Sequence, residues 1–167
     1  MFRKVVIGGT FDFMHKGHRK LLEMGASVSK EIIIGLTSDE FASRFRIEKV
    51  SPYKKRMEEL EQFLKKFSIR YKIVKIDDTY GVATLDPDID CIIVSEETLL
   101  RAEEINAIRF KKGLEKLTII VTPIVLADDG KPISSDRIRS GEIDAEGKKI
   151  NPGRSSPLTR TSPGGMR

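Results

Sequence analysis

Short apolar runs alternate with amphipathic segments along most of the chain. The runs have the length and enrichment in branched residues that are typical of buried strands. We predict strands over residues 2–8, 31–37, 71–76, 91–94 and 117–126. Apolar residues at helical spacing predict helices over residues 16–29, 39–46, 96–114 and 133–139, with another beginning at Ser51-Pro52 and a loop over 77–88.

Alternating strands and helices indicate an α/β fold: one doubly wound, Rossmann-like parallel sheet of about five strands with helices on both faces. We expect one domain over residues 1–147. Residues 148–167 are rich in Pro, Gly, Ser and basic residues without a core-forming pattern, which predicts a disordered tail.

Polar residues follow four of the predicted strands. They are Gly9 to His18, Thr37 to Asp39, Ser95 to Thr98, and Ser134-Ser135. Ligands of open α/β sheets bind beyond the carboxyl ends of the strands. We therefore expect these four segments to converge on one binding site.

Composition narrows the class of protein. No apolar run approaches the roughly 18 residues of a membrane span. The single cysteine, Cys91, falls in a predicted buried strand and fits a reducing compartment, so we expect a cytoplasmic protein that has no membrane partner.

The net charge of +5 comes from the C-terminal end of the chain. No acidic residue follows Glu146, whereas five of the 30 basic residues do, which leaves 25 of each sign in the rest. Nucleic-acid binding usually requires a basic excess on the folded body. We therefore expect no nucleic-acid partner, and a tail that binds RNA stays only as an alternative.

The first loop has the residues of an anion site. Gly8 and Gly9 permit close approach of a ligand to the backbone. His18 lies near a helix start, where the dipole favours negative charge, and His15 and the Thr10 hydroxyl add donors. Two unrelated surface histidines are the ordinary alternative, but the whole histidine complement lies in this one turn. With only two histidines, we expect no metal site in the protein itself.

Two motifs resemble the nucleotidyltransferase superfamily. Gly9-Thr10-Phe11-Asp12 followed by His15-Lys16-Gly17-His18 resembles its G-T-F-D…H-x-G-H signature. Residues 133–139 are similar to its second signature, I-S-S-T-x-I-R, with Asp136 in place of the usual threonine. The resemblance implies transfer of a nucleoside monophosphate to a phosphorylated acceptor.

The middle of the chain resembles phosphopantetheine adenylyltransferases of the archaeal and eukaryotic type. The matching stretches are residues 35–39, 52–56 and 94–98, and the resemblance covers about residues 2–142. It implies transfer of AMP from ATP to 4′-phosphopantetheine, giving dephospho-coenzyme A and pyrophosphate, with Mg²⁺ accompanying ATP. Nicotinamide mononucleotide, flavin mononucleotide or an alcohol phosphate as acceptor, and a non-catalytic nucleotide-binding module, stay open, as does the oligomeric state.

The resemblance also implies roles for individual residues. The catalytic residues would be Thr10, His15 and His18. ATP would contact Gly9, Thr10, Phe11, His15, His18, Ser95, Glu96, Ser134, Ser135 and Arg139. The acceptor would contact Thr37, Asp39, Arg44 and Arg56.

The residues alone leave ordinary roles open for several of these positions. Ser134 or Ser135 fits a helix cap beside a solvated Arg139, and Glu96 fits an acidic helix start. The cation for the acceptor phosphate could be Arg44, Arg46, Lys49 or Lys54, and most of the basic triplet 54–56 fits a solvated helix face. We expect Asp12 to stabilise its turn rather than act as a base.

Overall fold

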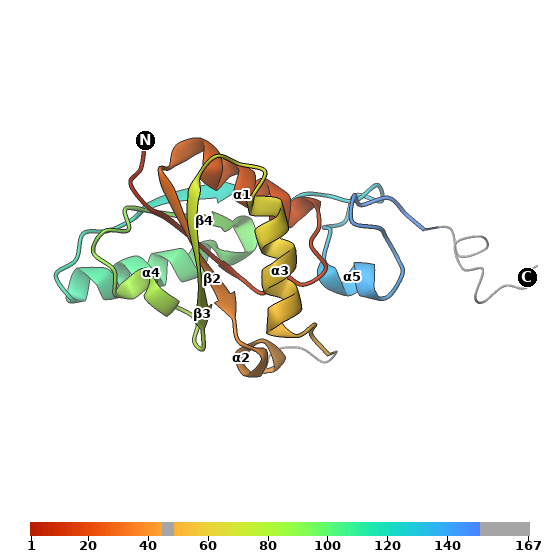
Figure 1. The fold of residues 1–167 in the computed structure, drawn as a ribbon, viewed down its shortest axis with the longest axis horizontal. Helices are drawn as coiled ribbons and strands as arrows, with labels where there is room; N and C mark the ends of the chain where they lie inside the picture. Colours follow the sequence, from red (N-terminus) through yellow and green to blue (C-terminus); the bar gives the residue numbers. More distant parts are fainter. Residues whose placement is uncertain (45–48, 151–167) are drawn as a thin grey trace, which may run out of the picture.

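The computed structural model describes residues 1–44 and 49–150. At its centre lies a sheet of five parallel strands in the order β3-β2-β1-β4-β5 (Figure 1). The strands are β1 (Val5–Gly9), β2 (Glu31–Thr37), β3 (Arg70–Ile76), β4 (Cys91–Ser95) and β5 (Thr118–Thr122). The chain reverses its direction of winding between β1 and β4, which is where doubly wound sheets bind ligands.

Helices cover both faces of this sheet, as predicted. They are α1 (Lys16–Val28), α2 (Asp39–Ser43), α3 (Tyr53–Leu64), α4 (Leu99–Lys111) and α5 (Ser135–Arg139), with 3₁₀ turns η1 (Gly81–Thr84) and η2 (Glu96–Thr98). Side chains of α1 and α3 pack in one core cluster, and those of η1 and α4 pack in a second. Figure 1 shows α5, in blue, outside the sheet.

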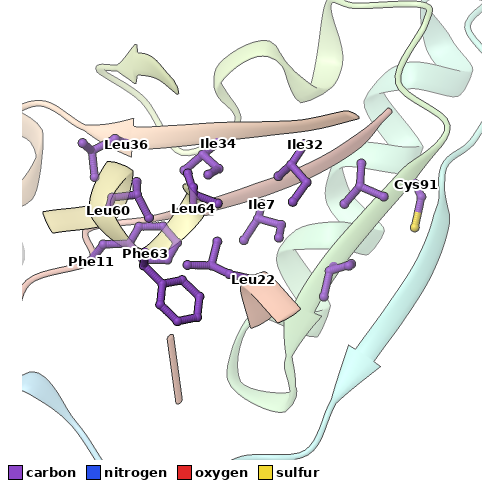
Figure 2. Close-up of a cluster of buried hydrophobic side chains, with 12 residues drawn as sticks. Ile7, Phe11, Leu22, Ile32, Ile34, Leu36, Leu60, Phe63, Leu64 and Cys91 are labelled. Atoms are coloured by element: carbon purple, nitrogen blue, oxygen red, sulfur yellow. The ribbon is translucent and has the colours of Figure 1, made fainter. Parts of the chain in front are cut away.

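The apolar runs form strands because both of their faces are buried. Along β2, Ile32, Ile34 and Leu36 pack towards α1 and α3, whereas Ile33 packs towards α4. Figure 2 shows the first set grouped with side chains of α3. In the edge strand β3 the basic residues are exposed and the apolar ones are half-buried, apart from the buried Ile76.

The predicted boundaries that were wrong include the end of β5 and both ends of α4. The strand predicted over 117–126 ends at Thr122, because Pro123 has no N–H to donate to the sheet. The helix predicted over 96–114 begins only at Leu99, after η2, and ends at Lys111, before Gly113 with φ of +80°. The predicted end of α2 near Arg46 lies outside the described residues.

The last described segment folds back on itself. Ile143 and Lys149 form an antiparallel bridge, and the Ile150 N–H donates to the carbonyl of Glu142. Most of the predicted tail, residues 151–167, lies outside the described residues, so its disorder stays a prediction. No helix in the described ranges is long and apolar enough to cross a membrane.

Candidate active site

A cavity of about 290 Å³ opens at the carboxyl edge of the sheet. Four predicted site residues line it: Gly9 at the end of β1, Thr10 directly after it, Thr37 at the end of β2, and Ser95 at the end of β4. The opposite wall comes from η1 and α4. Three of the four predicted segments therefore meet around one space.

A pair of glycines makes room for this cavity. Gly8 of β1 lies opposite Gly35 of β2 in the strand register, and both line the space. A Cβ placed on Gly8 would come no closer than 3.9 Å to any neighbouring atom, here the Gly35 carbonyl oxygen. The missing side chain of Gly8 leaves a hollow on the face of the sheet that α4 covers, whereas a Cβ on Gly35 would lie 3.2 Å from the Ile76 side chain.

The turn after β1 has an unusual backbone. Phe11 and Phe13 have φ of +50° and +49°, a conformation that residues with bulky side chains rarely adopt. The buried Phe11 ring offsets this strain by packing in the core beside Phe63 (Figure 2). A Cβ on Gly9 would lie 2.9 Å from that ring, so the turn requires glycine there. Phe11, predicted to contact ATP, is a core anchor of the loop.

Asp12, between these two residues, joins three segments. Its carboxylate accepts hydrogen bonds from the N–H groups of Phe13 and Ser51, and pairs with Arg139 at 2.9 Å. The Ser135 hydroxyl donates to the Asp12 carbonyl. Burial would raise the pKa of Asp12, but the bonds from Ser51 and Arg139 outweigh it and lower that pKa. The predicted turn-stabilising role of Asp12 is confirmed.

The two histidines cap each other at the start of α1. His15 Nδ1 accepts hydrogen bonds from the N–H groups of Gly17 and His18, and His18 Nδ1 accepts from the His15 N–H. The rings stack with centroids 3.7 Å apart. Burial lowers the pKa of His15 to about 4, with a smaller effect of the nearby Arg19 charge. Each Nδ1 is an acceptor, so each neutral ring carries its proton on Nε2.

Arg56 is fully buried beneath the cavity and is not a solvated cation. Its Nη1 donates to the Thr10 carbonyl at 3.0 Å and to the Thr37 hydroxyl at 3.3 Å. Its Nε donates to the Ser51 carbonyl at 2.7 Å, and its Nη2 pairs with Asp39 at 2.9 Å. The contact with the acceptor expected for Arg56 is therefore replaced by a network that holds Thr10 and Thr37. Its neighbours in the basic triplet, residues 54 and 55, are exposed.

The other predicted site residues divide into two groups. Ser134 caps α5 by accepting from the Arg137 N–H, and Arg139 pairs with Asp136 at 2.6 Å as well as with Asp12, so α5 is tied to the first loop. Glu96 instead accepts from the Ile124 N–H, and Arg44 lies over the Phe41 ring. Neither Glu96 nor Arg44 lines the cavity. Within the described ranges, no three His, Cys, Asp or Glu side chains gather as a metal site.

Sequence reasoning missed two parts of the cavity wall. Arg101, on α4, is the one Asp, Glu, Lys or Arg among the described residues that line it. Tyr80 and Gly81, at the start of η1, belong to the same wall. The sequence signals for these residues were weak. Arg101 is a basic residue some way after β4, and Gly81 is a glycine some way after β3. Such residues are common in surface loops.

Comparison with known proteins places the chain in a family. The model of the family described as cytidylyltransferase-like matches residues 6–141. A phosphopantetheine adenylyltransferase of Methanothermobacter thermautotrophicus is 48% identical over 146 residues, which are 87% of this chain and 88% of that protein.

Two further relatives differ in extent. A bifunctional phosphopantetheine adenylyltransferase/NTP phosphatase of Thermoplasma volcanium is 44% identical over 94% of this chain, which spans only 48% of that protein. A solved structure of a protein of unknown function from Archaeoglobus fulgidus has a TM-score of 0.65 and 36% identity, covering 71% of this chain and 88% of that one. The chain belongs to the cytidylyltransferase-like family and, within it, to the phosphopantetheine adenylyltransferases.

Proposed function

We propose that this chain transfers the adenylyl group of ATP to 4′-phosphopantetheine. An oxygen of the acceptor phosphate attacks the α-phosphorus of ATP, the bond from that phosphorus to the bridging oxygen of the β-phosphate breaks, and pyrophosphate leaves. Such a transfer needs positioning and charge stabilisation rather than a covalent nucleophile. The observation that carries the proposal is the histidine pair: reciprocal capping at the start of α1 fixes both Nε2 atoms as donors. Neither ring lines the cavity, but both follow its lining residue Thr10 within the same loop and helix start.

We assign different residues of the chain to different parts of the substrates. His15, His18 and the Thr10 hydroxyl donate to the phosphates, where charge develops as pyrophosphate departs. Ser134, Ser135 and Arg139 act on the outer phosphates, and Ser95 at the end of β4 contacts the nucleoside. Mg²⁺ enters as part of the MgATP substrate, held by phosphate oxygens and water.

We propose the cytoplasm as the location, because a lone cysteine fits a reducing compartment.

The lining of the cavity favours 4′-phosphopantetheine, with its long flexible arm, as the acceptor. This lining combines apolar side chains of β4 and η1 with the polar side chains of Thr37 and Arg101. Apolar walls with a few placed polar groups suit a flexible amide chain better than a second charged nucleotide. The single charged side chain in the described lining, Arg101, offers a cation to the acceptor.

The test is pyrophosphate release from purified protein with ATP and Mg²⁺. We expect turnover with 4′-phosphopantetheine, and dephospho-coenzyme A as the product by mass spectrometry. Nicotinamide mononucleotide, flavin mononucleotide and glycerol phosphate serve as parallel acceptors. Turnover with one of these and none with 4′-phosphopantetheine would reassign the acceptor, and no turnover with any would overturn the proposed reaction.

The donor role of His18 has a sharper test in His18→Asn. Asparagine keeps an acceptor near the Nδ1 position, which caps the helix, and removes the Nε2 donor. We expect kcat to fall about 100- to 1,000-fold, as for loss of one transition-state donor, with ATP affinity within a few fold of wild type. Unchanged kcat would exclude this role, and equal loss of ATP binding would assign His18 to ground-state binding.

A further inference from the structure

The Thr10 and Thr37 hydroxyls form a chain of hydrogen bonds that starts at Arg56. Arg56 Nη1 lies 3.3 Å from Thr37 Oγ1, which lies 3.1 Å from Thr10 Oγ1. Arg56 is fully buried and Thr37 is 7% exposed, so water has little access to the link between them, whereas Thr10 is half-buried. Thr10 and Thr37 both line the cavity, which places the far end of the chain at the site.

The direction of this chain follows from one chemical fact. A guanidinium group only donates hydrogen bonds, whereas a hydroxyl donates one and accepts others. Because Arg56 donates to Thr37 Oγ1, the Thr37 hydrogen turns away from Arg56 and is donated to Thr10 Oγ1. Thr10 Oγ1 accepts that hydrogen, so its own hydrogen is available only to a third partner.

Two further contacts hold the chain in place. The second hydrogen of Arg56 Nη1 is donated to the Thr10 carbonyl at 3.0 Å, which fixes the backbone of the same residue. Nη2 pairs with Asp39 at 2.9 Å, so the buried charge has a partner. Successive hydrogen bonds in a buried chain polarise one another in the direction of donation.

We propose that Arg56 and Thr37 are positioning residues which orient and polarise the Thr10 hydroxyl as a donor to the reacting phosphate. This inference rests on the proposed adenylyl transfer. Neither residue touches the phosphate through this chain, and both act through Thr10. The basic triplet 54–56 thus contains one residue that is directed inward and works at the site, beside two exposed lysines.

The test is a double-mutant cycle on kcat. Thr37→Val removes the relay hydroxyl with little change of shape, and we expect a threefold to tenfold loss of kcat, roughly the worth of one hydrogen bond. Thr10→Val should cost about 100-fold or more, as loss of a transition-state donor does. In the Thr10→Val background, Thr37→Val should cost nothing further, and Thr37→Ser in the wild-type background should recover most of the loss.

Thr122→Val is the matched control. Thr122 is also a buried threonine at the last position of its strand, and its hydroxyl donates to the Val94 carbonyl at 3.3 Å. We expect it to leave kcat unchanged. Arg56→Lys tests whether the chain of hydrogen bonds depends on the Arg56 guanidinium. If Arg56→Lys fails to fold, Thr37→Val still tests the proposal.

Three results would overturn the relay. The first is an equal loss of kcat from Thr37→Val in both backgrounds, and the second is a comparable loss from Thr122→Val. The third is wild-type kcat for Thr37→Val with the acceptor that the wild type uses. No turnover of the wild type with any of the four acceptors would instead overturn the proposed reaction and the relay together.

Discussion

His15 serves two purposes with one ring. Its Nδ1 caps α1 by accepting from two backbone N–H groups, which a protonated imidazole cannot do. Burial keeps the ring neutral by lowering its pKa to about 4. The cap therefore fixes both the tautomer and the charge of a residue that stands where phosphates are proposed to bind.

The same ring links stability to pH. The unfolded chain binds a proton at His15 near pH 6.5, whereas the folded chain does so only near pH 4. The unfolded state therefore gains protons first, and the stability contributed by the neutral ring is lost as the pH falls through this window. We expect the linkage to cost about 3 kcal/mol across it.

His15→Asn isolates this effect. Asparagine is a good N-cap and does not titrate, so its free energy of unfolding should fall less between pH 7 and pH 4 than that of the wild type. Urea unfolding at several pH values measures the difference between the two proteins, in which the carboxylates common to both cancel. Parallel curves for the two proteins would show that His15 is not buried in its neutral form.

At the scale of elements, α5 is too short to hold its place alone. It has five residues, lies outside the sheet, and is joined to the first loop by the Arg139–Asp12 pair and by the Ser135 hydroxyl. The Asp12 carboxylate also accepts from the Ser51 N–H just before α3. One buried carboxylate thus aligns three elements that are distant in the sequence.

We predict that Asp12→Asn releases α5 more than it unfolds the sheet. The amide keeps one acceptor but loses the charge that pairs with Arg139, at a cost of about 2–3 kcal/mol, the usual worth of a hydrogen bond to a charged group. Hydrogen exchange should speed up at the Arg137 and Ile138 amides and change little in β2. Asp136→Asn is the control, because that exposed partner of Arg139 should matter far less. Uniform acceleration in all elements would contradict this local role.

The elements differ in how far the sequence predicts them. The apolar run 31–37 is assigned correctly to the residue, because a strand buried on both faces leaves little choice of structure. The end of β5 was predictable from Pro123 but was placed too late.

Arg56 could not be identified as buried, because its burial depends on the Thr10 carbonyl and the Thr37 hydroxyl, which only the folded sheet brings together. The glycine turn and both histidines were recognised, since their signal is local.

At the scale of the whole molecule, the cavity is shaped as much by absent side chains as by present ones. Every strand that borders it contributes buried residues elsewhere, yet Gly8 and Gly35 stand opposite each other at its floor. Glycine costs stability inside a strand, because it packs nothing and loses more backbone entropy. Gly8 therefore makes sense as space kept open for a ligand, whereas Gly35 makes room for the Ile76 side chain.

Gly8→Val tests that interpretation, since it closes the space without straining the fold. The backbone at Gly8 is an ordinary strand, its added Cβ would have 3.9 Å of clearance, and valine favours strands. We expect the free energy of unfolding to hold or rise, while the KM for the acceptor rises about tenfold or more, which matches the usual cost of overpacking. Gly8→Ala should give a smaller rise. Steady-state kinetics and urea unfolding on the same samples separate the two effects. A stable Gly8→Val protein with wild-type KM would mean that the acceptor binds elsewhere, because a ligand that occupies this hollow cannot share it with a branched side chain.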